Sequence, residues 1–351
     1  MDLDNLELFH NLDTQDMLAH IDGLPGQLAQ AYKLGSELPL GAVKPIKQLV
    51  VAGMGGSAIG ADLLAACLAD RIRVPFIVHR DYDLPAFASG EDTLVVVSSH
   101  SGNTEESLSA FEMACQRGCQ VAAITTGGML QQLADQAGVP AWKFDHIGQP
   151  RTAVGFSFGL LLRLLERFGL IDNLSDEMEE AEKVMVTLQE RIKADVVVLN
   201  NPAKRQAGQM VGRHVTIFGS GFMAPVARRW KSEINEVAKA VASFEVLPEA
   251  DHNTLAGVYH PQELAATELA IFLKASADHP RNQLRNDLTR QIFMLEGIGT
   301  DFFNAKGQSR MAQMWSTLLF GDYISYYLAM AYGVDPTPIP PIAELKDRLS
   351  G

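Results

Sequence analysis

Short apolar runs alternate with longer amphipathic stretches along most of the chain. In the first half the apolar runs predict strands at 48–52, 74–78, 93–98 and 120–125, and residues 153–169 predict an apolar helix. Strands that alternate with helices in this way form a parallel sheet, because each crossover helix returns the chain to the same edge. We therefore expect the first half to fold as a doubly wound α/β domain.

The second half repeats this plan. Apolar runs predict strands at 214–218, 243–246 and 268–273, and longer stretches predict helices at 282–296 and 311–332. In both halves a glycine-rich loop follows the first strand and leads into a helix. Because ligands of such folds bind beyond the carboxyl ends of the strands, we expect a site at this edge of a sheet.

The chain has 351 residues, which suits about two domains of ordinary size. We expect an N-terminal helical arm over 1–46, a first domain over 47–172 and a charged helical linker over 173–213. A second domain with C-terminal helices and a tail would occupy 214–351. The predicted fold class is α/β, with two doubly wound, flavodoxin-like parallel sheets.

Composition and charge exclude several classes of protein. The formal net charge is −13, whereas binding to nucleic acid depends on clustered lysine and arginine. No apolar run approaches the roughly 20 residues of a membrane span, and residues 1–20 lack the apolar core of a signal peptide. The three cysteines form no CxxC motif. We expect a cytoplasmic protein without a metal site that binds neither nucleic acid nor membranes.

Hydroxyl side chains are concentrated at residues 98–104, where a predicted strand gives way to a helix. The first N–H groups of a helix lack intrahelical partners and carry partial positive charge, so such a place binds anions, most often phosphate. Ser99, Ser101 and Thr104 add O–H donors, and the segment contains no lysine or arginine. A helix N-cap is the alternative, but a cap needs a single hydroxyl. We favour a phosphate site and call residues 98–104 the hydroxyl loop.

Two segments, Gly53–Ala58 and Gly219–Ala224, fit the G-x-G-x-x-G/A fingerprint of dinucleotide-binding folds. Asp81, just after the second strand, would then bind the ribose of NAD. That hypothesis leaves the hydroxyl loop of the same sheet unexplained. If the two loops instead meet at one phosphate, Gly55-Gly56-Ser57 supplies close backbone N–H groups and one more hydroxyl. An NAD-dependent dehydrogenase stays open as the second hypothesis.

Gly55-Gly56-Ser57 and the Ser-x-Ser-Gly-x-Thr pattern of the hydroxyl loop resemble sugar isomerase (SIS) domains, a doubly wound fold that binds phosphosugars. Further segments resemble the bifunctional phosphoglucose/phosphomannose isomerase family. That family implies cofactor-free isomerisation of glucose 6-phosphate and mannose 6-phosphate with fructose 6-phosphate, by a homodimer with shared active sites. The segments are Arg229–Glu236, Leu247–Asn253, Gly321–Tyr323 and Val334–Pro338, with a lysine near the C-terminus.

Aldose–ketose isomerisation needs a base that moves a proton between C2 and C1 through an enediol, and a carboxylate suits this task. Ring opening needs an acid and a base, and an arginine stabilises the enediolate. The resemblance assigns these tasks to residues of this chain. Ser57, Ser99, Ser101 and Thr104 match the family's phosphate contacts, Arg151 its enediolate arginine, Glu236 its base, His252 and Lys346 its ring-opening pair, and Thr337 its threonine tied to mannose use.

Glu236 follows the second glycine loop on a predicted helix, from which it would point at a sugar held at the switch point of the sheet. The chain departs from the family pattern beside it, with Glu233 at a position that is often Gln and Val237 where Asn is usual. A phosphosugar-binding regulatory module without catalysis is the alternative to an enzyme. The presence of both Glu236 and His252 argues against it.

Overall fold

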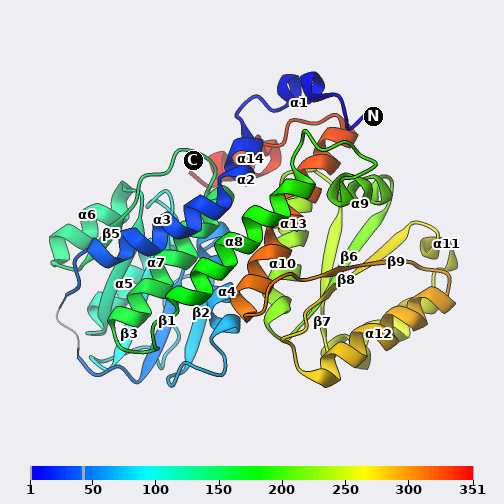
Figure 1. Ribbon diagram of the computed structural model, residues 1–351. Coiled ribbons are helices and arrows are strands. Elements are labelled where there is room, and N and C mark those ends of the chain that lie inside the picture. Colours follow the sequence, from blue (N-terminus) through cyan, green and yellow to red (C-terminus); the bar gives the residue numbers. More distant parts are fainter. Residues whose placement is uncertain (1, 42–43, 351) are drawn as a thin grey trace. The chain divides into compact units, whose positions relative to one another are not determined.

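The computed structural model describes residues 2–41 and 44–350, whose contacts form two compact units (Figure 1). We call Gly23–Glu182 the first-sheet unit, and Met1–Asp22 together with Lys183–Gly351 the second-sheet unit. The boundary between them falls within helix α8 (Ser175–Ile192). Each unit is built around its own parallel sheet.

The first-sheet unit contains a five-stranded parallel sheet in the order β2-β1-β3-β4-β5. This is the flavodoxin-like order. The connection after β1 leads to β2 on one side and the connection after β3 leads to β4 on the other, so a switch point lies between β1 and β3. The predicted doubly wound α/β fold is confirmed. The strands are β1 (Gln48–Ala52), β2 (Phe76–His79), β3 (Thr93–Ser99), β4 (Gln120–Thr125) and β5 (Ala141–Lys143).

Helices cover both faces of this sheet, because its strands are apolar on both sides. All residues of β3 are buried, and Val95 and Val97 pack in one cluster with Phe111 and Leu130 of α5 and α6. On the other face α4 packs against α7, which also carries α3. The helices are α3 (Leu24–Glu37), α4 (Gly55–Cys67), α5 (Glu105–Gln116), α6 (Gly128–Ala137), η1 (Pro150–Ala153) and α7 (Val154–Arg167).

The second-sheet unit repeats the same winding with four parallel strands in the order β7-β6-β8-β9. Its switch point lies between β6 and β8, which corresponds to the β1–β3 position of the first sheet. The internal repeat predicted from the two glycine loops is therefore present. The strands are β6 (His214–Ser220), β7 (Ala242–Leu247), β8 (Glu268–Lys274) and β9 (Gly299–Asn304).

Helix α13 (Arg310–Tyr332) is buried from Met311 to Met330 and packs against α10 and α9. A helix that is buried all round is mostly apolar, and the buried charge of Asp322 on this one is paired with Arg229. On the opposite face of the sheet, Phe293 of α12 packs on Phe218 and Phe272. The other helices are α1 (Leu6–Leu12), α2 (Met17–Asp22), α9 (Pro202–Met210), η2 (Gly221–Met223), α10 (Ala224–Glu236), η3 (Glu249–His252), η4 (Thr254–Tyr259), α11 (Gln262–Ala265), α12 (Pro280–Leu295) and α14 (Pro340–Ser350).

Within the described part of the chain, no helix combines the length and the apolar character that crossing a membrane requires.

Candidate active site

The first glycine loop follows β1 and opens α4 at the switch point of the first sheet. Gly55 has a positive φ of 49°, a conformation that glycine adopts without strain. A Cβ at Gly56 would lie only 2.4 Å from the carbonyl oxygen of Pro150, so the glycine lets the segment before α7 approach closely. Ser57 follows in the first turn of α4 and is buried at 8% exposure. The loop thus presents a backbone that a ligand or a neighbouring segment can reach.

The hydroxyl loop follows β3 and contacts the glycine loop directly. The backbone N–H of His100 donates to the Oγ of Ser57 at 3.2 Å. Within the loop, the Oγ of Ser99 lies 3.1 Å from the Oγ1 of Thr104 and accepts a hydrogen bond from the N–H of Gly102. The structure therefore brings Ser57, Ser99 and Thr104 together at the carboxyl edge of the sheet, as the meeting of two loops requires.

The helix-cap alternative for this loop does not match the geometry of α5. Thr104 is the N-cap residue, with an extended backbone, but its side chain makes no capping hydrogen bond. Ser101 is exposed, and its Oγ accepts from the N–H of Asn103 in a local turn. The first turn of α5 thus begins without the side-chain cap that the alternative demands. This leaves the Thr104 hydroxyl pointing at Ser99 and available to an anion.

Arg151, the predicted enediolate arginine, lies near the glycine loop. It lies in η1, which packs against α4, and its backbone nitrogen is 3.1 Å from where a Cβ on Gly56 would lie. The side chain is buried at 5% exposure. Its position beside the glycine loop suits an anionic ligand, because a guanidinium forms charge-assisted hydrogen bonds with phosphate or enediolate oxygens.

Three further polar residues lie beside the two loops, although no sequence motif indicated them: His100, His146 and Thr152. The Nε2 of His100 lies 2.9 Å from the Nδ1 of His146, whose Nε2 lies 3.3 Å from the Oγ1 of Thr152. Burial lowers the pKa of His100, which favours its neutral form. The position of His100 within the Ser-x-Ser pattern was the one feature of the sequence that could have indicated its place at the site. His146 lies in a segment without regular secondary structure, and no motif indicates it.

Glu236 is the last residue of α10 and is half-buried. Helix α10 begins at the second glycine loop and spans about 20 Å, so its last residue lies near the amino end of the neighbouring strand β7. The assignment of Glu236 as the base stays a prediction. Because β7 is parallel to β6, the chain has to cross back to the amino edge of the sheet before β7 can start. Helix α10 makes this crossover, and Glu236 is its last residue.

A buried ion cluster precedes Glu236 on α10. Arg229 donates to Asp322 of α13 at 2.9 Å and lies 3.0 Å from Glu233, and all three are 3–4% exposed. Burial opposes the charge of Arg229, but the carboxylates of Asp322, Glu233 and Glu236 raise its pKa. Burial also raises the pKa of Asp322, against the effect of Arg229. Glu233, the departure from the family pattern, thus belongs to the packing of α10 on α13.

His252 ends η3, just beyond the carboxyl end of β7, and is exposed. The residue before it, Asp251, accepts hydrogen bonds from Arg285 at 2.6 Å and from Thr289 at 2.7 Å. Both donors lie on α12, which fixes the short segment that carries His252. Within one second-sheet unit, His252 and Glu236 lie at opposite ends of β7, whose six residues span about 20 Å.

Lys346 and Thr337 lie in the C-terminal segment. Lys346 is exposed on α14, which is exposed along its described length. Thr337 is buried, and its N–H donates to the Oδ1 of Asp335, whose Oδ2 accepts from Thr14 at 2.6 Å. This ties the tail to the start of the chain and fixes Thr337 in place.

The second glycine loop holds a carboxylate of the chain itself. Asp278, from the loop after β8, accepts hydrogen bonds from the Oγ of Ser220 at 2.5 Å and the N–H of His279 at 2.7 Å. A Cβ at Gly221 would lie 2.5 Å from its Oδ1. The negative charge of Asp278 beside this loop disfavours the phosphate of a dinucleotide there, which weakens the support that the Gly219–Ala224 fingerprint gave to an NAD site.

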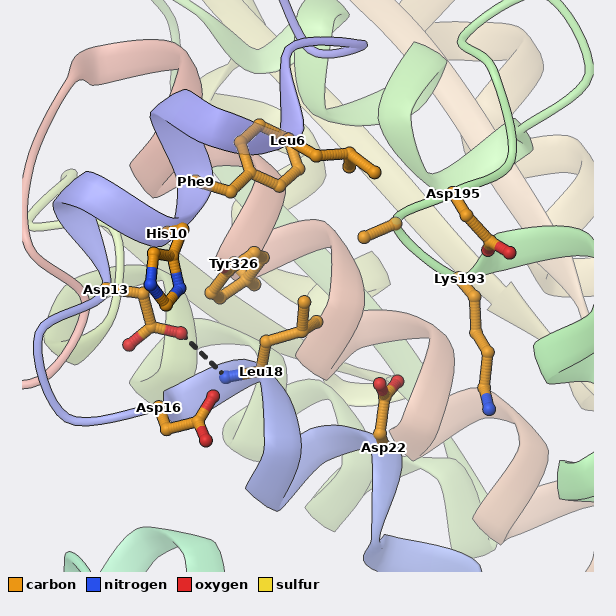
Figure 2. Close-up of a pocket in the computed structure, with 11 residues that line it drawn as sticks. Leu6, Phe9, His10, Asp13, Asp16, Leu18, Asp22, Lys193, Asp195 and Tyr326 are labelled. Carbon is orange, nitrogen blue, oxygen red and sulfur yellow. Dashed lines mark hydrogen bonds between the residues drawn. The ribbon is translucent and has the colours of Figure 1, made fainter.

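A separate cavity of about 410 Å³ lies in the second-sheet unit, and its wall contains none of the predicted site residues (Figure 2). Asp13, Asp16, Asp22 and Asp195 line it, so its field disfavours a phosphate. The carboxylate of Asp13 accepts from the N–H of Leu18 at 2.9 Å and so stabilises the start of α2. Among residues 2–41 and 44–350, no three or more histidine, cysteine or acidic side chains gather as a metal site would require.

Comparisons with protein families and curated proteins agree with one another. A SIS domain model matches residues 43–138, and the model of the bacterial phospho-glucose isomerase C-terminal SIS domain matches residues 199–349. A bifunctional phosphoglucose/phosphomannose isomerase from Caldicellulosiruptor bescii is 39% identical over 95% of this chain and 99% of its own length. The protein of that name from Aquifex aeolicus is 34% identical over 87% of this chain and 91% of its own.

Solved structures share the fold at low sequence identity. A hypothetical protein from Thermus thermophilus aligns with a TM-score of 0.73 at 16% identity, covering 99% of this chain and 94% of its own. The C-terminal domain of glucosamine-fructose-6-phosphate aminotransferase from Francisella tularensis aligns at 0.70 and 15% identity, with coverages of 92% and 98%. These likenesses extend the shared fold over nearly the whole chain.

Proposed function

The chain belongs to the bifunctional phosphoglucose/phosphomannose isomerase family, and from this premise we propose that it interconverts glucose 6-phosphate and mannose 6-phosphate with fructose 6-phosphate without a cofactor. The observation that carries the proposal is the meeting of the hydroxyl loop with the glycine loop beside buried Arg151. Hydroxyl donors, helix N–H groups and one guanidinium suit a phosphorylated sugar that develops further negative charge during the reaction.

In this proposal the phosphate is bound by hydroxyl and backbone donors and the chemistry is carried by a carboxylate. Glu236 takes the proton from C2 of the aldose and returns it to C1, which gives the ketose through an enediol. Arg151 stabilises the negative charge of the enediolate. The phosphate donors are Ser57, Ser99, Ser101 and Thr104, together with the N–H groups of Gly55 and Gly56.

Cyclic hexose phosphates must open before isomerisation, and we assign this step to His252 and Lys346. One group donates a proton to the ring oxygen while the other accepts the proton from the hydroxyl at C1. A histidine changes its protonation state near neutral pH and suits such an exchange. Thr337 is assigned to the discrimination between glucose and mannose epimers at C2, and its buried, fixed position suits a residue that selects by shape.

We also propose that the enzyme is a homodimer in which Glu236 and His252 of one site come from different chains. The two residues lie at opposite ends of β7 in one chain, about 20 Å apart along the strand. Leu284, Leu288, Ile292 and Leu295 form an exposed apolar stripe on α12, with 36–85% of each residue exposed. The same helix anchors the His252 segment through Asp251, so a second copy on this stripe would lie next to His252.

A coupled assay with each of the three hexose 6-phosphates, with and without EDTA, tests the proposed function. We expect EDTA-resistant interconversion of all three in the absence of added NAD. Binding of the sugars without turnover would instead establish a regulatory module, and turnover that requires NAD would establish a dehydrogenase.

A further inference from the structure

Two histidines that the proposed mechanism leaves unused join the hydroxyl loop to the segment that carries Arg151. His100 lies within the loop, and its backbone is held on both sides. Its N–H donates to Ser57, and its carbonyl oxygen accepts from the hydroxyl of Thr126 at 2.7 Å. Its ring lies 2.9 Å from the ring of His146 in hydrogen-bond contact. His146 then meets Thr152, the residue that follows Arg151.

The hydrogen bonds assign a proton to each ring nitrogen of this chain of contacts. The hydroxyl of Thr152 donates to the carbonyl oxygen of Gln149 at 2.8 Å, so its oxygen accepts from the Nε2–H of His146. If both rings are neutral, the Nδ1 of His146 accepts from the Nε2–H of His100. We assign both rings this Nε2–H tautomer, because burial lowers the pKa of His100 and so favours its neutral form.

Aromatic packing fixes the two rings in this arrangement. Phe144 and Phe156 stack at 4.7 Å, and they contact the rings of His100 and His146 edge-on, each at 6.0 Å. Thr152 is fixed from the other side, because the Nε2 of Gln27 donates to its carbonyl oxygen at 2.8 Å. A pair of rings with so little freedom transmits the position of one backbone segment to the other.

We propose that the His100–His146–Thr152 contacts form a bridge that positions Arg151 relative to the bound phosphate, so that His146 and Thr152 are positioning residues for the isomerase. Residues 144–149 contain no helix or strand. The bridge connects this segment, through His146, to Thr152 of η1. The inference rests on the proposed function, in which Arg151 stabilises the enediolate. Displacing a charged group by about 1 Å costs on the order of 10²-fold in rate.

Thr152→Val and Thr152→Ser test the bridge as a matched pair. Valine has the shape of threonine but cannot accept from His146, whereas serine keeps the hydroxyl. We expect Thr152→Val to lower kcat about 10-fold to 100-fold, with less than about a threefold change in inhibition by inorganic phosphate, and Thr152→Ser to recover most of the rate. Thr93→Val makes the same change at a buried threonine at the start of β3 and should retain wild-type kcat.

Ring-nitrogen NMR spectra of the whole protein supply a readout that does not depend on activity. Near pH 7.5 we expect the ring-nitrogen chemical shifts of two neutral Nε2–H histidines that form hydrogen bonds. In Thr152→Val, the change in chemical shift that the hydrogen bond causes at the Nε2 of His146 should disappear. Charged rings or Nδ1–H tautomers would overturn the bridge. Correct tautomers with an unchanged kcat in Thr152→Val would overturn its positioning role. A wild-type protein that shows the tautomers but no isomerase activity would overturn the proposed function, and with it the role given to the bridge.

Discussion

At the scale of single residues, the candidate phosphate site depends on hydroxyls and backbone N–H groups, with one arginine set apart from them. Residues 98–104 contain no cation, and Arg151 enters from η1 instead. This division matters because the chain carries a net charge of −13, which repels an anionic substrate at long range. We therefore expect binding to come from short directional contacts, with a measurable share from each hydroxyl.

Removing these hydroxyls should weaken phosphate and sugar phosphate together. We expect Ser101→Ala and Thr104→Val each to raise the inhibition constant of inorganic phosphate and the KM of fructose 6-phosphate. Each lost donor to a charged oxygen costs roughly 1.5–3 kcal/mol. Ser109→Ala, on the same helix but bonded to Asp83, is the control and should leave both constants unchanged. Unchanged phosphate inhibition in both loop variants would reduce the loop to a structural turn.

Glu236→Gln should abolish isomerisation while binding of the sugar phosphate persists. The amide keeps the size of the side chain but cannot accept the proton from C2, and loss of a general base costs on the order of 10²–10⁴-fold in kcat. Glu263→Gln, an exposed site in the same unit, serves as the control. Calorimetry with fructose 6-phosphate checks that binding survives. Turnover near the wild-type value would contradict the assignment of the base.

At the scale of elements, the sequence predicts the inner strands of both sheets and the edge strands β2 and β7, but misses the edge strands β5 and β9. β1, β3, β4, β6 and β8 are continuous apolar runs because both of their faces are covered. β5 has three residues and β9 is mostly only partly buried, so neither carries such a run. Edge strands pair on one side and need less apolar character, which leaves little signal in the sequence.

The site shows the same division between local and nonlocal information. The glycine and hydroxyl loops could be predicted, because a strand, a loop and a helix follow one another in the sequence. The bridge from His100 to His146 depends on contacts across 46 residues, and no local pattern indicates it. The end of the sheet near which Glu236 lies depends on the length of α10, and not on the loop from which the helix starts.

The docking of α2 on α13 gives the protein a pH-dependent element. Burial raises the pKa of Asp22, which accepts a hydrogen bond from Tyr323. A raised pKa means that the folded protein binds this proton more tightly than the unfolded chain, so the contribution of Asp22 to stability falls as the pH rises above its ordinary value of 3.8. Asp22→Asn keeps an acceptor for Tyr323 and removes the titration.

We therefore expect Asp22→Asn to match the wild type in free energy of unfolding near pH 4 and to exceed it at pH 7. Urea unfolding at both pH values measures this difference. Asp347→Asn makes the same change at an exposed site and should show no such dependence. A variant that is less stable than the wild type at pH 7 would mean that the ionised carboxylate stabilises the fold.

At the scale of the whole molecule, the two copies of one winding differ at their switch points. The proposed phosphate site lies at the first, whereas the carboxylate of Asp278 lies against the glycine loop of the second. We therefore expect one phosphate site per chain. In the proposal, the second-sheet unit contributes acid–base residues, and its exposed α12 stripe contacts a second copy.

A charge on the α12 stripe should separate the proposed dimer. Leu288 is 49% exposed at the centre of the stripe, so Leu288→Asp leaves the core intact but places a carboxylate where a second copy would bury it. We expect light scattering to show a dimer for the wild type and a monomer for the variant, with unchanged circular dichroism. Leu199→Asp alters an exposed leucine outside the stripe and should remain dimeric. A dimeric Leu288→Asp variant would place the interface elsewhere.

Shared active sites make a prediction that a single chain cannot satisfy. If each site takes Glu236 from one chain and His252 from the other, Glu236→Gln and His252→Ala homodimers are both inactive on cyclic substrate. A heterodimer of these two chains has one site with both residues intact and one with neither, so it should regain about half of the wild-type activity.

Wild type paired with the double variant gives the opposite pattern, because each shared site then lacks one residue and the heterodimer should be inactive. If the two residues act within one chain, the first heterodimer is inactive and the second retains half of the sites. Co-expression with two affinity tags isolates each heterodimer, and mass spectrometry confirms its composition. The first heterodimer is therefore active only if the sites are shared, and the second only if each site lies within one chain. A general loss of folding would inactivate both heterodimers and so would match neither model.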